Sequence, residues 1–372
     1  MNKCIIIGAG IIGATTAYRL AKSGANVVLI DENIPGRATQ AASGIICPWL
    51  SQRRNQDWYE LAKNGAHFYP QLIQELEDDG EMATGYAKVG AITIRQNEAK
   101  LNEIKERAIT RRKDAPEIGD IQLLTQAETK DIFPPIADGY GAVYISGGAR
   151  VSGQLLQDAL IRASQKYGAQ FIEGKASLHL IGNKITGVKV KDELIEGDIV
   201  IAANGAWMDK LFEPLPITFH SYPQKGQLLH IALPNIDTAH WPVVMPPSNQ
   251  SIVPFDDHII IGATHEAREV GFDRRVTAGG LHEILTTALE FAPGLAHSTF
   301  LKTKVGFRPY TPEFLPVIGK LPHYEGLILA NGLGASGLTT GPFIGTQLAQ
   351  LALDENITID LSKYDVSNAI TF

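Results

Sequence analysis

The sequence predicts an α/β fold in which a parallel, Rossmann-like sheet is combined with a second, mostly antiparallel α+β part. A short apolar run at 4–7 leads directly into the glycine-rich segment Gly8-Ala-Gly-Ile-Ile-Gly13. Two later apolar runs also end in turns of small residues, at 198–207 and 327–340. Residues 217–304 instead carry short strand-like segments with frequent Pro and His between them. The first pattern is typical of parallel sheets, and the second favours an antiparallel sheet.

The first thirty-one residues carry a dinucleotide-binding pattern. Gly8 permits a tight turn, Gly10 lets a pyrophosphate approach the backbone, and Gly13 lets the following helix (14–22) pack closely on the strand. The N-terminus of that helix presents unpaired N–H groups to phosphates. A second strand ends at Asp31, which can accept hydrogen bonds from a ribose hydroxyl and would repel the extra phosphate of NADP.

Composition narrows the class of protein. The chain has 372 residues, is 44% hydrophobic and 20% charged, and carries a net charge of −7. Its size suggests two domains or one large α/β unit. The longest basic cluster is Arg111-Arg112-Lys113, so nothing favours a nucleic-acid partner.

Two cysteines make no disulfide framework, which favours a reducing compartment. No segment approaches about 20 apolar residues, so we expect no membrane span. We expect a cytoplasmic protein, with peripheral membrane contact and homo-oligomer formation left open.

Two segments after the second strand favour close packing. The run at 35–44 is made of small residues and one arginine, and it predicts either close backbone approach to a large planar ligand or a mobile surface loop. The helix expected at 58–77 has a stripe of apolar residues that belongs in a core. Thr125 with Glu128 predicts a capping box, and Ser152 an N-cap. Further strands are expected at 89–95, 141–146, 170–173, 175–180, 184–190, 194–201, 227–232, 250–254, 258–262, 316–319 and 327–330, and further helices at 97–112, 154–166, 278–291 and 342–353.

Two segments near the C-terminus are expected to lack regular secondary structure. Residues 304–312 contain two prolines and predict a loop. Residues 331–340 form a turn of small residues between the strand at 327–330 and the last helix. Such a turn can aim N–H groups at an anion or a carbonyl oxygen.

Taken together, these motifs resemble the D-amino-acid oxidase superfamily of FAD enzymes, over nearly the whole chain. Within it, the sequence is most similar to glycine oxidases and to the small-subunit type of D-amino-acid dehydrogenase. The motifs that carry the resemblance are Gly8–Gly13 with Asp31, Arg37–Gly44, Ala202–Trp207, Tyr222–Gly226, Ile252–Pro254, Ile261–Thr264, Gly306–Pro312 and Gly332–Gly337.

The resemblance implies an extended, noncovalent FAD and no metal. It also implies a discontinuous FAD-binding domain (1–80, 145–215 and 305–372) and a discontinuous substrate-binding domain (81–144 and 216–304). Ser177 would meet the adenine through its backbone. The residues implied at the cofactor are Gly8, Gly10, Ile11, Ile12, Gly13, Asp31, Glu32, Arg37, Thr39, Ser43, Gly44, Ile45, Ser177, Ala203, Gly205, Trp207, Arg308, Gly332, Gly334, Ala335, Ser336, Gly337, Leu338 and Thr339.

Arg308 is the main candidate for binding the substrate. In the family this arginine holds the substrate carboxylate over the flavin, and a guanidinium fork suits that task. The alternative is a structural or surface arginine. Glycine oxidases have a tyrosine where this sequence has Ser251, and an arginine where it has Ala335. The carboxylate would therefore have fewer partners, or other ones such as Tyr310 or Asn249.

The implied reaction is oxidative deamination of a small D-amino acid or glycine. The Cα hydrogen would pass as hydride to flavin N5, and the resulting imine would hydrolyse to a 2-oxo acid. Orientation can carry such chemistry without a protein base at Cα. The electron acceptor would be O2 or a quinone or other carrier. The alternatives are a flavoenzyme of the same fold acting on sarcosine, a cyclic amine or a 2-hydroxy acid, a non-catalytic flavin-binding protein, and an NAD dehydrogenase.

Overall fold

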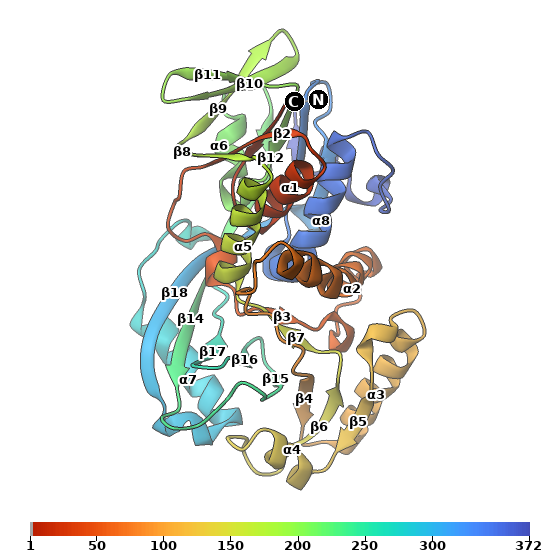
Figure 1. Cartoon of the computed structure of the whole chain (residues 1–372). Helices are drawn as coiled ribbons and strands as arrows, with labels where there is room; N and C mark the ends of the chain where they lie inside the picture. Colours follow the sequence, from red (N-terminus) through yellow and green to blue (C-terminus); the bar gives the residue numbers. More distant parts are fainter. Residues whose placement is uncertain (1–2) are drawn as a thin grey trace.

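The computed structural model describes residues 3–372 and arranges them as two parts stacked end to end (Figure 1). The upper part of Figure 1 holds the first and last segments of the chain, and the lower part holds strands from the middle of the sequence. No helix within residues 3–372 combines the length and the apolar character needed to cross a membrane.

A six-stranded sheet forms the centre of the upper part. Its strand order is β19-β20-β12-β1-β2-β8, and only the pairing of β19 with β20 is antiparallel. This confirms the predicted α/β class with a parallel, Rossmann-like sheet. The strands are β1 (Lys3–Ile7), β2 (Asn26–Asp31), β8 (Gln170–Glu173), β12 (Ile199–Ala202), β19 (Val317–Lys320) and β20 (Leu327–Asn331).

The two faces of this sheet are covered differently. Cys4 and Ile6 belong to one core with helices α1 (Ile11–Lys22), α2 (Gln56–Asp78), α5 (Gly153–Lys166) and α8 (Gly337–Ala352). Ile5 and Ile7 belong to a second core on the opposite face, because successive side chains of a strand point to opposite sides. That second core includes α6 (Met208–Phe212) and a small antiparallel sheet of β9 (Ala176–Ile181), β10 (Lys184–Val190) and β11 (Glu193–Glu196).

An eight-stranded sheet dominates the lower part, in the order β18-β14-β17-β16-β15-β4-β6-β5. Its pairs are antiparallel except for β15 with β4, which confirms the mostly antiparallel second sheet. Helix α7 packs on β14 and β17, while α3 and α4 pack on β5 and β6. These elements are β4 (Ala91–Arg95), β5 (Ile121–Leu124), β6 (Gly141–Ile145), β14 (Tyr222–Ala232), β15 (Val243–Met245), β16 (Ser251–Pro254), β17 (Ile259–Gly262), β18 (Thr299–Tyr310), α3 (Glu98–Arg112), α4 (Gln126–Ile132) and α7 (Ala278–Phe291).

Two short sheets complete the fold. Strand β3 (Ile45–Ile46) pairs with β7 (Ala149–Arg150) between the two large parts, and β13 (Thr218–Phe219) pairs with β21 (Ile370–Thr371). The expected capping box of Thr125 and Glu128 is present, and Ser152 caps α5 as expected. The domain boundaries stay a prediction. The boundary predicted between residues 304 and 305 falls inside strand β18.

The expected loop at 304–312 was wrong, because most of it belongs to strand β18. Strand β18 lies at the edge of its sheet and pairs with β14 along its length, with Pro309 opposite Pro223. An edge strand tolerates proline, since one of its sides needs no hydrogen-bond donor. The expected strand at 194–201 is in fact two strands, β11 and β12, in different sheets.

The last helix begins at Gly337, five residues before the predicted start at Pro342. Proline has no N–H, so Pro342 cannot donate to the carbonyl of Leu338 one turn earlier. The buried hydroxyl of Tyr69 on α2 donates to that carbonyl instead, at 2.6 Å. A side chain from another helix therefore allows α8 to extend past its proline.

The close contact between α2 and α8 predicts an unusual response to alanine. At Gly65 of α2 a Cβ atom would lie 2.1 Å from the carbonyl oxygen of Thr339. Alanine normally stabilises a helix interior over glycine by about 1 kcal/mol. For Gly65→Ala we expect the reverse, a loss of about 1–3 kcal/mol from overpacking, measured by urea unfolding.

Gly279→Ala is the matched control for this prediction. Gly279 lies in the first turn of α7, and a Cβ atom there would meet no heavy atom within 4 Å. We expect this variant to unfold at the same or a slightly higher urea concentration. Equal stability of Gly65→Ala and Gly279→Ala would contradict the steric argument.

Candidate functional site

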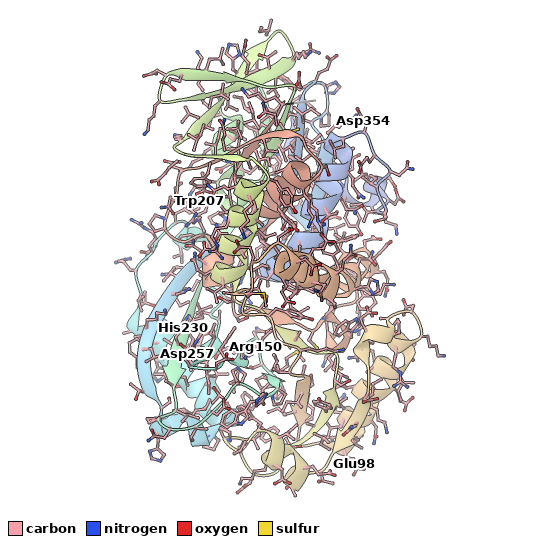
Figure 2. All side chains as sticks on the ribbon, in the orientation of Figure 1. Glu98, Arg150, Trp207, His230, Asp257 and Asp354 are labelled. Carbon is pink, nitrogen blue, oxygen red and sulfur yellow. The ribbon has the colours of Figure 1, made fainter. Side chains whose placement is uncertain are left out.

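A cavity of about 600 Å³ lies at the carboxyl ends of four parallel strands, β1, β2, β12 and β20. In open α/β sheets this edge is the usual place for a ligand. The cavity also reaches β14 and β18 of the second sheet, so both large parts contribute to its wall. Trp207, one of its lining residues, lies where the upper and lower parts meet (Figure 2).

At one end of the cavity lie Gly8, Gly10, Ile11 and Ile12, where β1 turns into α1. Gly10 is the N-cap of α1, and it offers no side chain to the first N–H groups. Of these, the N–H of Ile11 donates to Oγ1 of Thr39 at 3.0 Å. This end of the cavity therefore has the features of an anion-binding site at a helix N-terminus.

Asp31 lies beside this turn and has three donors within the chain. Its carboxylate accepts hydrogen bonds from the N–H of Ala9 at 2.6 Å, the N–H of Asn33 at 2.7 Å and Nη1 of Arg37 at 3.0 Å. Glu32 lines the same stretch of the cavity and is exposed. Asp31 thus stabilises the turn after β1 and the loop after β2, and it also lines the cavity.

The loop after β2 contributes Arg37, Thr39, Ser43, Gly44 and Ile45 to the wall. Its middle, Ala38–Ala41, is a short 3-10 turn, and Nζ of Lys304 donates to the carbonyl of Gln40 at 2.7 Å. These contacts do not support the alternative of a mobile surface loop. The planar ligand expected against it stays a prediction.

The opposite wall is built from two segments of small residues. Ala203, Gly205 and Trp207 follow β12, and residues 334–339 lead into α8. The N-terminus of α8 has no side-chain cap, and its first residue, Gly337, lines the cavity. A second helix N-terminus therefore lies at the cavity wall. Oδ1 of Asn204, another lining residue, is buried and has no partner among residues 3–372. The residues of the second segment are Gly334, Ala335, Gly337, Leu338 and Thr339.

Three predicted residues support the cavity without lining it. At Gly13 a Cβ atom would lie 1.8 Å from the carbonyl oxygen of Gly8, so this glycine lets α1 pack on β1. At Gly332, where φ is +82°, a Cβ atom would lie 1.9 Å from Oγ1 of Thr311. Ser336 accepts a hydrogen bond from Nε1 of Trp58 at 2.8 Å.

Ser177 and Tyr310 are predicted site residues that do not line the cavity. Ser177 is already paired with Lys189 in strand β9, and the chain lines the cavity just before it, at 174–176. Tyr310 lies outside the lining, because its ring stacks on Tyr222 with centroids 5.7 Å apart and meets the edge of Phe314.

Arg308 and Asn249 both line the cavity. Nη1 of Arg308 donates to Oε1 of Gln224 at 3.1 Å and to the carbonyl of Thr264 at 3.0 Å. A Cβ atom at Gly226 would lie 2.9 Å from Cζ and from both terminal nitrogens, so the guanidinium lies flat over this glycine. Burial lowers the pKa of Arg308, but an arginine stays charged in proteins. Both recorded hydrogen bonds use Nη1, which leaves Nε and Nη2 for a ligand.

Sequence reasoning missed several lining residues, of which His265 is the most informative. Burial and, secondarily, the positive charge of Arg308 lower the pKa of His265. His265 directly follows the Ile261–Thr264 motif, so its position in the sequence was an available signal. Lys175 and Lys210 gave no such signal, because isolated lysines are common on surfaces. The other missed residues include Gly262, Ala263, Asn33, Ile34, Gly174, Ala176, Asn204, Leu211 and Asn331.

Among the lining residues within 249–265 and 306–309, Arg308 carries the one permanent charge. Arg308 is cationic, whereas His265 is neutral above its lowered pKa and Asn249 and Ser251 are uncharged. This arrangement suits a small anion such as a carboxylate. No group of three or more His, Cys, Asp or Glu side chains within residues 3–372 is arranged to hold a metal ion.

Comparisons with known proteins identify the family. The model of the family described as FAD-dependent oxidoreductase (DAO) matches residues 3–351. The chain is 54% identical over 371 residues to the uncharacterized oxidoreductase YurR of Bacillus subtilis, with 100% of both chains covered. It is 29% identical over 369 residues to a glycine oxidase of Pseudomonas aeruginosa, with 98% of both chains covered.

A solved structure agrees with these matches. The iminodiacetate oxidase of Chelativorans sp. BNC1 superposes with a TM-score of 0.94 at 42% identity, covering 97% of this chain and 98% of that one. The family match and the structural match both extend over most of the chain. The protein therefore belongs to the DAO family of FAD-dependent oxidoreductases.

Proposed function

We propose that the protein oxidises the C–N bond of a small amino acid, of the D-amino-acid or glycine type, and that Arg308 binds the substrate carboxylate. The observation that carries this proposal is the guanidinium of Arg308 in the cavity wall, fixed by Gln224 and Thr264 through Nη1 alone. FAD, when bound, supplies the acceptor for the hydride that leaves Cα, and the imine product hydrolyses to a 2-oxo acid and an amine or ammonia.

The cavity has features that fit an extended FAD. Two helix N-termini without side-chain caps, those of α1 and α8, face it from different directions, and both favour negative charge. The buried Oδ1 of Asn204, which has no partner among residues 3–372, can accept a hydrogen bond from a ligand. We propose that Gly8–Ile12 bind the pyrophosphate, that Asp31 or Glu32 binds the ribose, and that the 37–45 loop, Ala203–Trp207 and residues 334–339 line the rest of the cofactor. Ala176 is proposed at the adenine in place of Ser177.

The residues of the chain would act mainly by orientation. Arg308 would fix the carboxylate, Asn249 and Ser251 would contact the polar remainder of the substrate, and the surrounding walls would exclude water. Positioning of this kind can supply much of the rate of a hydride transfer. The amine must be neutral when it reacts, and none of these groups is required to remove a proton from Cα.

A second candidate substrate is a glycine whose nitrogen carries a further small group, such as sarcosine or iminodiacetate. Ser251 and Ala335, both in the cavity wall, stand where the resemblance to glycine oxidases implies a tyrosine and an arginine. Smaller side chains leave room beside the amine. The 42% identity to an iminodiacetate oxidase supports the same candidate.

Anaerobic mixing with a substrate panel tests both candidates. The purified protein is mixed with glycine, D-alanine, sarcosine, iminodiacetate and a 2-hydroxy acid, and the loss of flavin absorbance is followed. Fast bleaching by glycine or D-alanine supports the first candidate, and bleaching only by the N-substituted glycines supports the second. Bleaching by the hydroxy acid alone would contradict both. Repeating turnover with O2 or a quinone analogue identifies the acceptor.

Replacing Arg308 by lysine tests the carboxylate site. Lysine keeps the positive charge but loses the planar fork, so we expect kcat/KM for the best substrate to fall about 30- to 100-fold. Flavin content, read from the visible spectrum, should remain near that of the unmodified protein. Arg275→Lys, at a side chain that is 83% exposed, serves as the control. An unchanged kcat/KM for Arg308→Lys would exclude Arg308 from the site.

The lowered pKa of His265 predicts the pH dependence of the reaction. Because the pKa of His265 is lowered, its ring is mostly neutral from about pH 6.5 upward, so the acidic limb of kcat/KM should report the substrate amine. His265→Asn should therefore leave the midpoint of that limb in place between pH 6.5 and 10. The unfolded chain binds this proton more readily, so His265 lowers the free energy of unfolding as pH falls below about 6.5. A shifted limb in His265→Asn would show that this histidine titrates during turnover.

A further inference from the structure

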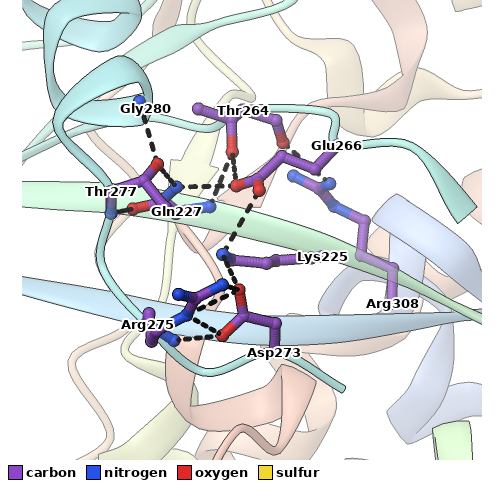
Figure 3. Close-up of polar contacts among 9 residues, drawn as sticks. All are labelled: Lys225, Gln227, Thr264, Glu266, Asp273, Arg275, Thr277, Gly280 and Arg308. Carbon is purple, nitrogen blue, oxygen red and sulfur yellow. Dashed lines mark hydrogen bonds and ion pairs between the residues drawn. The ribbon is translucent and has the colours of Figure 1, made fainter. Parts of the chain in front are cut away.

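Strand β14 lines the cavity and also carries residues of a polar network, whose contacts Figure 3 shows. Gly226 and Leu228 line the cavity, whereas Lys225 and Gln227 alternate with them and point away from it. The side chain of Lys225 is 0% exposed, and Gln227 is equally buried. A buried lysine is stable only when it is paired with an opposite charge, so the partners of Lys225 are structurally required.

Thr264 connects this network to the cavity. Its N–H donates to the carbonyl of Gln227 at 3.0 Å, and its Oγ1 accepts from the N–H of Gln227 at 2.9 Å and donates to Oε1 of Glu266 at 3.1 Å. Its carbonyl accepts the hydrogen bond from Arg308 described above. Thr264 is 0% exposed and is thus fixed by both its backbone and its side chain.

Glu266 is the acidic centre of the network. Its Oε2 lies 3.2 Å from Nζ of Lys225, and its Oε1 accepts from Nε2 of Gln227 at 2.7 Å. Its N–H donates to the carbonyl of Lys225 at 3.0 Å. Asp273 lies farther from Lys225, at 3.7 Å, and its carboxylate also binds the exposed Arg275. Glu266 is therefore the nearer counter-charge of the buried lysine.

The network thus fastens the chain to β14 on both sides of His265. Between these two anchors, the carbonyl of Thr264 accepts the hydrogen bond from Arg308, and His265 lines the cavity. We propose that Glu266, paired with Lys225, is a positioning residue that holds the carbonyl of Thr264 against Arg308. The pair thereby sets the affinity of the site for a substrate carboxylate. This inference rests on the proposed role of Arg308.

Glu266→Gln is the first test, because it keeps the size of the side chain and removes only its charge. The FAD-bound protein is titrated with acetate, and the dissociation constant is read from the change in the flavin spectrum. We expect this constant and KM for the best substrate to rise about tenfold, with kcat changed by less than about threefold. Arg275→Gln, which removes the exposed partner of Asp273, should leave all three values within about twofold.

The double variant Lys225→Met with Glu266→Gln separates positioning from general damage. Removing both charges leaves no unpaired buried ion, but the carboxylate that holds the network is still absent, so the acetate constant should stay raised about tenfold. A constant within about threefold of that of the unmodified protein would assign the effect of Glu266→Gln to the unpaired Lys225 and would overturn the positioning role. Thr264→Val should weaken acetate binding as Glu266→Gln does, because it removes the hydroxyl that joins Gln227 to Glu266. Thermal unfolding and flavin content of each variant identify any that fails to fold.

The outcomes distinguish this inference from the proposed function. If Glu266→Gln and Thr264→Val bind acetate like the unmodified protein while Arg308→Lys does not, the positioning role is wrong and the carboxylate site stands. If Arg308→Lys also binds acetate normally, the proposed function itself fails. If Glu266→Gln does not fold, Thr264→Val and the double variant decide the question by the same titration.

Discussion

The antiparallel pairing of β14 with β18 is the constraint on which the rest of the site depends. Its register sets Arg308 opposite Gln224, and Gly226 opposite Gly306. Side chains that face the cavity from β14 are thereby brought beside those of β18, and Gly226 leaves space for the guanidinium of Arg308, which would otherwise meet a Cβ atom. A shift of one residue would turn Arg308 to the opposite face of the sheet.

The same pairing joins the two large parts of the molecule. Phe307 of β18 forms a bridge with Arg37, whose own guanidinium binds Asp31 at the end of β2. The edge of the antiparallel sheet thus reaches the parallel sheet through a short chain of contacts. Trp207 packs against Phe307 and Phe272 with ring centroids 6.1 Å and 5.1 Å apart, and it strengthens this junction with apolar surface.

The local parts of the structure could be read from the sequence, and the parts that depend on distant partners could not. Gly8, Gly10 and Asp31 lie where predicted because the motif specifies strand, turn and helix within one short segment. The residues of β18 were misread because Pro309 predicts a loop until its partner strand is known. Tyr310 is two residues from Arg308, yet its ring turns to Tyr222, which spacing alone does not reveal.

The proline in α8 has a consequence for how that helix can move. Helix ends normally fray one hydrogen bond at a time, at little cost to neighbouring elements. In α8 the carbonyl of Leu338 is held by the phenol of Tyr69, which is fully buried in α2. Loosening this first turn therefore requires breaking a contact inside the core, so the start of α8 and the middle of α2 should open as one cooperative unit. We therefore expect the amide protons at the start of α8 to exchange about as slowly as those of the core.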